Sequence, residues 1–282
     1  MQMLVMCAMA LVMMLVSALV VMALTSGGLD TTSPSGLRWS QAITSLLTFA
    51  LPVVVMTSLY YKGEQREFYG LRFGGHEWLV ALAGVVAMLL VVPLNELLSE
   101  WNDTWDLGAV GDALRAVQDQ NEDLVGMLLS ADTVGGMVAN IVVVALAAAV
   151  CEELFFRCGV QNLLERWFRN PHAAVVVTAC VFSLIHGEIF SFVPRLVLGI
   201  LLGYLYVYGR SPLPNMLAHF VNNALVVVLY WLVARGVLDI DPEAPIDFGW
   251  PLTAACTVAA VGLMWAACSR RKDNKDQGNV MP

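Results

Sequence analysis

The chain has 282 residues, of which 59% are hydrophobic and only 13% are charged. Soluble domains carry about 25% charged residues, so this composition excludes an ordinary soluble protein and indicates one that crosses a membrane several times. The formal net charge of −8 and the absence of a basic cluster before the C-terminal tail argue against a nucleic-acid-binding protein.

Eight apolar stretches are candidates for membrane helices. A helix needs about 20 apolar residues to cross the hydrocarbon core, and the fifth and sixth stretches are shorter than this. The first contains no Lys or Arg and is longer than the apolar part of a signal peptide, so we interpret it as a membrane helix. We predict an all-α fold, a polytopic transmembrane helix bundle with about eight spans. The predicted spans are Met3–Leu24, Gln41–Tyr61, Trp78–Leu98, Gly136–Phe156, His172–His186, Pro194–Gly209, Leu213–Ala234 and Trp250–Cys268.

The basic residues are distributed unevenly between alternate loops. One set of loops and tails contains 11 of the 15 Lys and Arg residues, and the other contains the remaining 4. Cytoplasmic loops carry the excess of Lys and Arg, so we predict that both termini are cytoplasmic. The acidic regions around Glu96–Asp132 and Asp239–Asp247 then face outward. In the first, Leu107–Leu129 has apolar residues at helical spacing, which fits an amphipathic helix on the outer surface or a solvated loop.

Two adjacent carboxylates, Glu152 and Glu153, follow one of the most apolar runs of the chain. A charge in the hydrocarbon core costs about 2.5 kcal/mol or more, so such residues usually serve a function. Glu153 and Arg157 are four residues apart with the acid first, the favourable order for an ion pair within a helix. Glu152 is rotated by about 100° from Glu153. We therefore predict that Glu153 and Arg157 form a structural pair and that Glu152 projects into the bundle.

Two later spans carry further polar residues. Phe182 and His186 share one face of the fifth span, and His219 and Asn223 share one face of the seventh. A single buried histidine is usually a hydrogen-bonded structural residue. Here, however, a glutamate, two histidines and an asparagine interrupt three apolar spans. Unpaired polar groups are costly in a membrane, so we expect Glu152, His186, His219 and Asn223 to meet in one cavity.

These residues resemble the motifs of a known family. E-E-x-x-x-R at Glu152–Arg157, F-x-x-x-H at Phe182–His186 and H-x-x-x-N at His219–Asn223 are similar to the three motifs of the CPBP group (CAAX proteases and bacteriocin-processing enzymes), also called the ABI family. The segment Arg195–Tyr206 between the second and third motifs is also similar to that family. The resemblance covers about Gly136–Leu232. It implies an intramembrane endopeptidase similar to the type II CAAX endopeptidases.

The resemblance also implies a role for each residue. Glu152 would be the general base that activates a water molecule, assisted by His186. His219 and Asn223 would stabilise the tetrahedral oxyanion. The supporting residues would be Glu153, Arg157 and Phe182.

Metal dependence has two readings. Glu152, His186 and His219 could bind zinc and leave the fourth position to water. The chain has no H-E-x-x-H motif, and the six cysteines show no zinc or disulfide spacing. A mechanism without a metal, in which Glu152 activates the water, would use the same three residues. We therefore expect either no required cofactor or a divalent metal, with zinc as the candidate.

We predict four parts of the chain. Residues 1–135 hold three transmembrane helices and the outer amphipathic loop, and residues 136–235 hold the catalytic core with helices four to seven. Residues 236–269 hold the last transmembrane helix, and residues 270–282 form a polar cytoplasmic tail.

The depths of the site residues pose a geometric problem. If the fifth helix starts at the cytoplasmic face, His186 lies about 21 Å along it, whereas Glu152 lies near the cytoplasmic end of a fourth helix that stops at Phe156. Glu152 and His186 can meet in one of three ways. The fourth helix continues into Arg157–Glu165, the fifth helix starts in the cytoplasm, or the helices tilt strongly. We expect a site between the middle of the membrane and the cytoplasmic face.

Two other functions fit the composition. A catalytically silent membrane protein, acting in bacteriocin self-immunity or as a scaffold, could use the same polar residues for helix packing. A proton-coupled transporter would also place Glu and His in the membrane, but it would favour inverted repeats, which the sequence lacks. For a protease, the expected partners are the lipid bilayer and a peptide or protein substrate arriving from the membrane or cytoplasm, with no nucleic acid. We expect an integral protein of a prokaryotic cytoplasmic membrane.

Overall fold

The computed structural model describes residues 1–71, 74–242 and 244–277, with side chains up to Ala267 in the last helix. The described residues form helices joined by turns and loops, and they include no β-strand. This confirms the predicted all-α class. The α-helices are α1 (Gln2–Ser26), α2 (Pro34–Thr44), α3 (Leu51–Tyr60), α4 (Gln65–Tyr69), α5 (Gly75–Leu90), α6 (Val92–Asp103), α7 (Gly108–Leu129), α8 (Val134–Asn140), α9 (Ala148–Glu153), α10 (Asn162–Phe168), α11 (Pro171–Ile185), α12 (Phe192–Gly209), α13 (Leu213–Ala234) and α14 (Trp250–Gln277). The π-helical turns are η1 (Ser45–Ala50), η2 (Ile141–Ala147) and η3 (Leu154–Gln161), and a 3₁₀ turn, η4 (Ile189–Ser191), precedes α12.

The π-helical turns join shorter segments into long continuous helices. Pro34–Tyr60 is one helix of 27 residues, and Val134–Phe168 is one helix of 35 residues. The predicted fourth span therefore continues for twelve residues beyond Phe156. By contrast, α5 and α6 meet at an angle of 46°. Pro93 explains this bend, because its ring nitrogen cannot donate a helical hydrogen bond.

Six helices in the described part of the chain are long and apolar enough to cross a membrane, or seven if the bent α5–α6 pair counts as one span. The predicted fifth span corresponds to α11, which is apolar but has only 15 residues. Seven of the eight predicted stretches thus overlap one continuous helix, and the third, Trp78–Leu98, overlaps the bent α5–α6 pair. The protein is an integral membrane protein with several spans, and the total of eight stays a prediction.

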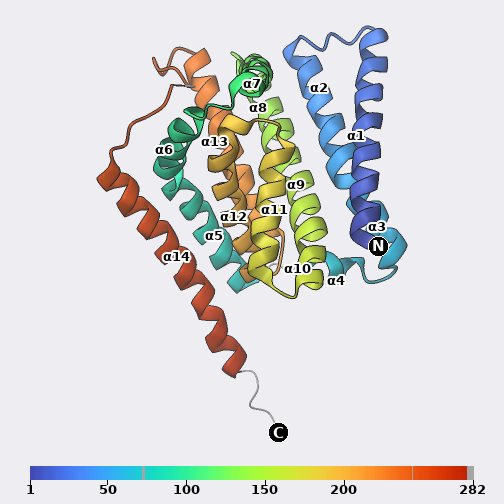
Figure 1. The fold of residues 1–282 in the computed structure, drawn as a ribbon, viewed down its shortest axis with the longest axis vertical. Helices are drawn as coiled ribbons and strands as arrows, with labels where there is room; N and C mark the ends of the chain where they lie inside the picture. Colours follow the sequence, from blue (N-terminus) through green and yellow to red (C-terminus); the bar gives the residue numbers. More distant parts are fainter. Residues whose placement is uncertain (72–73, 243, 278–282) are drawn as a thin grey trace.

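The helices form a bundle with a clear difference between its two ends (Figure 1). The N-terminus, α4, the turn between α10 and α11 and the C-terminal end of α14 lie at one end, and α7 lies across the other. The central helices are α5, α9, α11, α12 and α13, with α1 to α3 on one side and α14 on the other. The amphipathic helix predicted at Leu107–Leu129 is present as α7.

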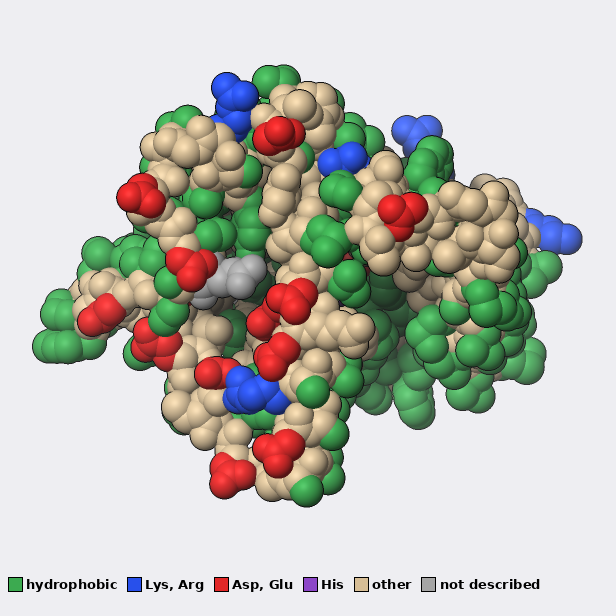
Figure 2. Space-filling model, turned by 90° about the horizontal axis from the view of Figure 1, so that it is seen from above, with side chains coloured by type: hydrophobic (Ala, Val, Ile, Leu, Met, Phe, Trp, Pro, Cys, Tyr) green, Lys and Arg blue, Asp and Glu red, His purple; other side chains and the backbone are tan. Residues whose placement is uncertain are grey.

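The α7 end is acidic. Figure 2, which views the molecule from this end, shows many Asp and Glu side chains and few Lys or Arg side chains. Glu96, Glu100, Asp103 and Glu122 surround a hollow of about 280 Å³ there. Both predicted acidic regions thus contribute to the end opposite the N-terminus, since Pro245 lines the same hollow. That this end faces outward stays a prediction.

Three predictions fall partly outside the described residues. Residues up to Gln277 of the predicted polar tail continue α14, and residues 278–282 lie outside the described part. Arg72, one of the residues used to predict the orientation, and Glu243 of the second acidic region also lie outside it.

Close packing of α11 against α12 fixes the framework of the central helices. α11 begins at Pro171, and the side chain of Asn170 caps it by accepting hydrogen bonds from two backbone N–H groups. On α12, a Cβ atom at Gly199 would lie 3.0 Å from the Cβ of Ala179, and one at Gly203 would lie 2.8 Å from Val175 Cγ1. Only glycine therefore allows the two helices to approach so closely.

Candidate active site

The four predicted catalytic residues line one cavity of about 180 Å³ in the central bundle. Glu152 comes from α9, His186 follows the end of α11, and His219 and Asn223 come from α13. Phe182, one of the three predicted supporting residues, lines the same cavity. The structure thus brings these side chains together from three separate helices, while their catalytic roles stay predictions.

The long fourth helix carries Glu152 to this cavity. Of the three ways to bring Glu152 and His186 together, the structure shows the first, because the helix continues to Phe168 and Glu152 lies near its middle. The π-helical turns η2 and η3 lie directly before and after the α9 segment that carries Glu152 and Glu153. Such turns occur frequently at functional sites, where they change the direction in which side chains project.

The depth of the cavity in the membrane stays a prediction. α11 runs from the end of the bundle that holds the N-terminus toward the α7 end (Figure 1). His186, which directly follows α11, and Arg195, in the first turn of α12, therefore extend the cavity wall toward α7. His219, on the other side of the cavity, lies within the first two turns of α13.

Glu153 has two partners. Its Oε2 atom accepts a hydrogen bond of 2.9 Å from Arg157 Nε, which confirms the predicted ion pair, and both side chains are fully buried. Its Oε1 atom lies 3.1 Å from His219 Nδ1. Because an ionised carboxylate only accepts hydrogen bonds, Nδ1 carries a hydrogen and donates it. Glu153 therefore orients a residue of the cavity in addition to pairing within its own helix.

The second nitrogen of His219 faces the other carboxylate. His219 Nε2 lies 3.9 Å from Glu152 Oε2, and both side chains are about nine-tenths buried. This distance is too long for a direct hydrogen bond. The histidine thus lies between two glutamates, bonded to Glu153 and close to Glu152.

His186 is held by its own helix. Its Nδ1 atom lies 2.7 Å from the carbonyl oxygen of Phe182. A carbonyl oxygen can only accept, so Nδ1 donates and Nε2 of the neutral ring is left as an acceptor. The Phe182 ring packs edge-on against His186 with ring centres 4.9 Å apart, and lies 6.2 Å from the His219 ring and 5.6 Å from Arg157 Cζ. Phe182 therefore packs between the residues of all three motifs.

Asn223 is oriented by weaker hydrogen bonds. Its amide nitrogen donates to the carbonyl of Val144 at 3.4 Å, and its amide oxygen accepts from Asn222 at 3.3 Å. Val144 belongs to η2, so the π-helical turn before Glu152 also contacts the third motif.

The sequence motifs did not identify every residue of the wall. The additional lining residues are Met88, Arg195, Leu198, Leu202 and Asn222. Arg195, at the start of the predicted sixth span and one of the four basic residues counted on the outer side, lies in α12 and forms an ion pair with Glu188. A single charge at the start of an otherwise apolar helix was the signal that could have indicated its position.

The cavity residues do not gather as a metal site. In the part of the chain that the structure describes, no group of three or more His, Cys, Asp or Glu side chains has a suitable arrangement. The set Glu152, His186 and His219 does not fit zinc in this arrangement, and we derive no step through a metal.

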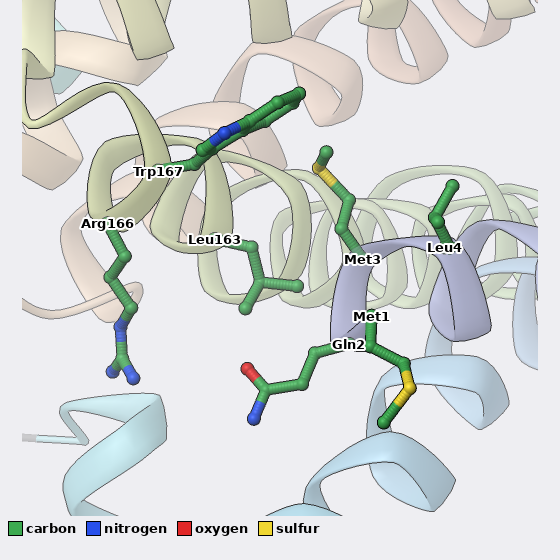
Figure 3. A pocket seen from close by; sticks show the side chains of 7 residues that line it. All are labelled: Met1, Gln2, Met3, Leu4, Leu163, Arg166 and Trp167. Atoms are coloured by element: carbon green, nitrogen blue, oxygen red, sulfur yellow. The ribbon is translucent and has the colours of Figure 1, made fainter.

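A second kind of hollow lies away from these residues. A groove of about 430 Å³ separates the start of α1 from α10 and is lined by Met1, Gln2, Met3, Leu4, Leu163, Arg166 and Trp167 (Figure 3). Its lining contains no carboxylate and no histidine. It therefore lacks the acid–base groups that the α9–α11–α13 cavity provides.

Comparison with known proteins agrees with the motifs. A family model described as type II CAAX prenyl endopeptidase Rce1-like matches residues 134–225. This segment begins with α8 and ends within α13, so it contains all seven predicted catalytic and supporting residues. The predicted resemblance to CAAX proteases is confirmed for this segment. No curated protein and no solved structure matches the chain.

Proposed function

We propose that this protein, whose residues 134–225 form a domain of the type II CAAX prenyl endopeptidase Rce1-like family, is an active intramembrane endopeptidase. It would hydrolyse a peptide bond in a membrane-associated or lipidated peptide or protein. One observation carries the proposal: Glu152, His186, His219 and Asn223 line a single small cavity between membrane helices. A cavity of this kind combines acid–base groups with apolar walls that limit water, which suits hydrolysis of a bound peptide.

The proposed first step is attack by water. A water molecule hydrogen-bonded to Glu152 and to the acceptor nitrogen of His186 would lose a proton to Glu152 as its oxygen bonds to the peptide carbonyl carbon. Glu152 would then return this proton to the leaving amine when the carbon–nitrogen bond breaks. The products are a carboxylic acid and an amine, and transfer of the second proton of the water from the acid to the amine gives a carboxylate and an ammonium group, so the glutamate ends the cycle as it began.

The proposed second element is stabilisation of the oxyanion. A doubly protonated His219 would donate from Nδ1 to Glu153 and from Nε2 to the oxyanion, and the amide of Asn223 would supply a second donor. Fixed donors in a cavity with little water stabilise such charge more effectively than in bulk water. Glu153 and Arg157 would act by holding His219 in place.

Substitution of Glu152 tests the proposal. Glu152→Gln preserves the size of the side chain but removes the base, so we expect the cleavage rate to fall by about 100-fold or more. The measurement is mass spectrometry of the products of lipidated tail peptides incubated with the purified protein in nanodiscs. Glu67→Gln is the matched control, because the side chain of Glu67 on α4 is exposed. This variant should cleave the peptides as the wild type does. The same assay with a zinc chelator tests the metal-free mechanism, which requires unchanged cleavage.

The result also separates the other functions. Full cleavage by Glu152→Gln at normal membrane abundance would show that Glu152 is not the base. If instead the variant keeps the complete biological effect of the protein while the wild type cleaves nothing, the protein is a catalytically silent membrane protein or a transporter. We further propose a prokaryotic cytoplasmic membrane as its location, and the helices long and apolar enough to cross a bilayer support the membrane part of this proposal.

A further inference from the structure

A second cavity adjoins the proposed active site on the side of α7. Its volume is about 440 Å³, and it is lined by Glu122 and Val125 of α7, Tyr230 of α13, and His186, Glu188 and Arg195. His186 and Arg195 also line the 180 Å³ cavity that contains Glu152. The two side chains thus form a common wall, and a peptide that extends from one cavity into the other must contact them.

Arg195 has unused hydrogen-bonding capacity at this wall. Its Nη2 atom donates to the carboxylate of Glu188, and 20% of the Arg195 side chain is exposed. Its Nη1 atom is buried and has no hydrogen-bond partner within the described residues. A guanidinium carries five N–H donors in a planar fork that matches a carboxylate, and leaving a buried donor unpaired is unfavourable. A ligand oxygen that contacts the exposed part of this guanidinium would therefore meet donors that Glu188 does not occupy.

Arg195 is the one position in the described lining of the two cavities where an anion meets an opposite charge. Among the described residues that line them, Arg195 is the single Lys or Arg, whereas Glu122, Glu152 and Glu188 are acidic. An anionic group would be repelled by these carboxylates at other positions and attracted only beside Arg195. A neutral carbonyl group would bind Arg195 less tightly than an anion does, because hydrogen bonds between charged groups are stronger.

We infer that Arg195 forms an anion subsite next to the catalytic cavity, where it binds a carboxylate of the peptide substrate. The inference rests on the proposed peptidase function. The carboxylate is either the C-terminus of the peptide or an acidic side chain near the scissile bond. Glu188 occupies part of the guanidinium in the empty site and competes with this carboxylate.

Direct binding tests the inference without requiring cleavage. The probes are three acetylated tetrapeptides of alanine and leucine: one with a free C-terminal carboxylate, one with a C-terminal amide, and one amide in which a leucine is replaced by glutamate. Their affinities for the full-length protein in nanodiscs are measured by microscale thermophoresis. We expect the wild type to bind a carboxylate-bearing peptide about 10-fold to 100-fold more tightly than the neutral amide, the effect of one charged hydrogen bond. The better of the two anionic peptides identifies the source of the carboxylate.

Three variants assign this preference to Arg195. Arg195→Gln should abolish the preference for the anionic peptide, and Arg195→Lys should retain part of it, because lysine keeps the charge without the planar fork. Glu188→Gln should increase the preference, since it removes the competing carboxylate, and this variant keeps Arg195 itself intact. Arg115→Gln is the matched control, because Arg115 also pairs with a carboxylate near α7 but lines neither cavity.

The possible outcomes are distinct. Equal binding of anionic and neutral peptides by the wild type, no binding of any of them, or a preference that survives Arg195→Gln would each overturn the inference. Failure of the proposed peptidase function appears separately, as a wild type that binds peptides with the expected preference but releases no cleavage product.

Discussion

Glu153 connects two of the three motifs through its two oxygen atoms. One accepts from Arg157 on the same helix and the other accepts from His219 on α13. Arg157 has two further buried nitrogen atoms without hydrogen-bond partners in the described structure, so Glu153 is the carboxylate that compensates its charge. The residue thus stabilises a buried cation and fixes the position of a proposed catalytic histidine at the same time.

Substitution of Glu153 should therefore affect both stability and cleavage. Glu153→Gln leaves the buried Arg157 without a counter-charge, a change that costs about 3–5 kcal/mol in known buried pairs, so we expect a lower Tm and little cleavage. Glu152→Gln should lose cleavage with a nearly unchanged Tm, since its nearest ionic contact is 3.9 Å long. Thermal unfolding of both variants in nanodiscs, measured beside the cleavage assay, provides the comparison. A Glu153→Gln protein as stable as the wild type would contradict the proposed role of Glu153.

At the scale of helices, the packing of α11 against α12 fixes part of the cavity wall. α11 positions Phe182 and His186, and α12 contributes Arg195. The two helices lie close together at Gly199, where an added Cβ would lie 3.0 Å from Ala179 Cβ and 3.1 Å from Ala179 Cα. Because one of these atoms belongs to the backbone, a side-chain rotation cannot relieve the contact.

A methyl group at Gly199 should push the two helices apart. We expect Gly199→Ala to destabilise the protein by about 1–3 kcal/mol, the usual cost of overpacking, and to reduce cleavage because Arg195 and His186 move relative to each other. Gly262→Ala in α14 is the control, since a Cβ there meets no atom within 4 Å. That variant should be as stable as the wild type or slightly more stable, because alanine favours helix. Unfolding measured in nanodiscs checks both, and equal stabilities would show that α11 and α12 are not closely packed at this point.

The sequence predicted the helices and the composition of the cavity because membrane energetics leave few alternatives. Long apolar runs must form helices, and Glu152, His186, His219 and Asn223 are expensive in lipid unless they share an environment. The length of the fourth helix was not predictable in the same way. Its extension is partly polar, and polarity usually indicates the end of a span. In the structure, Arg157 and Gln161 are fully buried within the bundle.

Contacts between helices were the other part that the sequence could not specify. The bond between Glu153 and His219 depends on how α13 is rotated relative to α9, and that rotation follows from packing. The two π-helical turns around α9 likewise change which side chains share a face, and the spacing of residues in the sequence assumes a regular helix. For the same reason the sequence placed Arg195 at the start of the sixth span without showing that it lines the cavity.

At the scale of the whole molecule, the two ends of the bundle differ in charge. Carboxylates gather at the α7 end (Figure 2), while Lys62, Arg66, Arg166 and Arg169 lie on or beside α4 and α10 at the end that holds the N-terminus. The positive-inside rule then predicts that the termini are cytoplasmic and that α7 faces outward. In that orientation the cavity beside Arg195, which Glu122 and Val125 of α7 line, lies toward the outer side.

Reporter fusions and surface labelling test this orientation in intact cells. A C-terminal green fluorescent protein should fluoresce, and alkaline phosphatase fused at the same position should be inactive, because the first folds in the cytoplasm and the second requires an oxidising compartment. A cysteine introduced at Ser99, in the acidic hollow, should react with a membrane-impermeant maleimide before lysis. One introduced at Glu67 on α4 should react only after lysis. The reverse pattern would place the acidic end in the cytoplasm, so that the cavity beside Arg195 would receive its peptides from the cytoplasmic side.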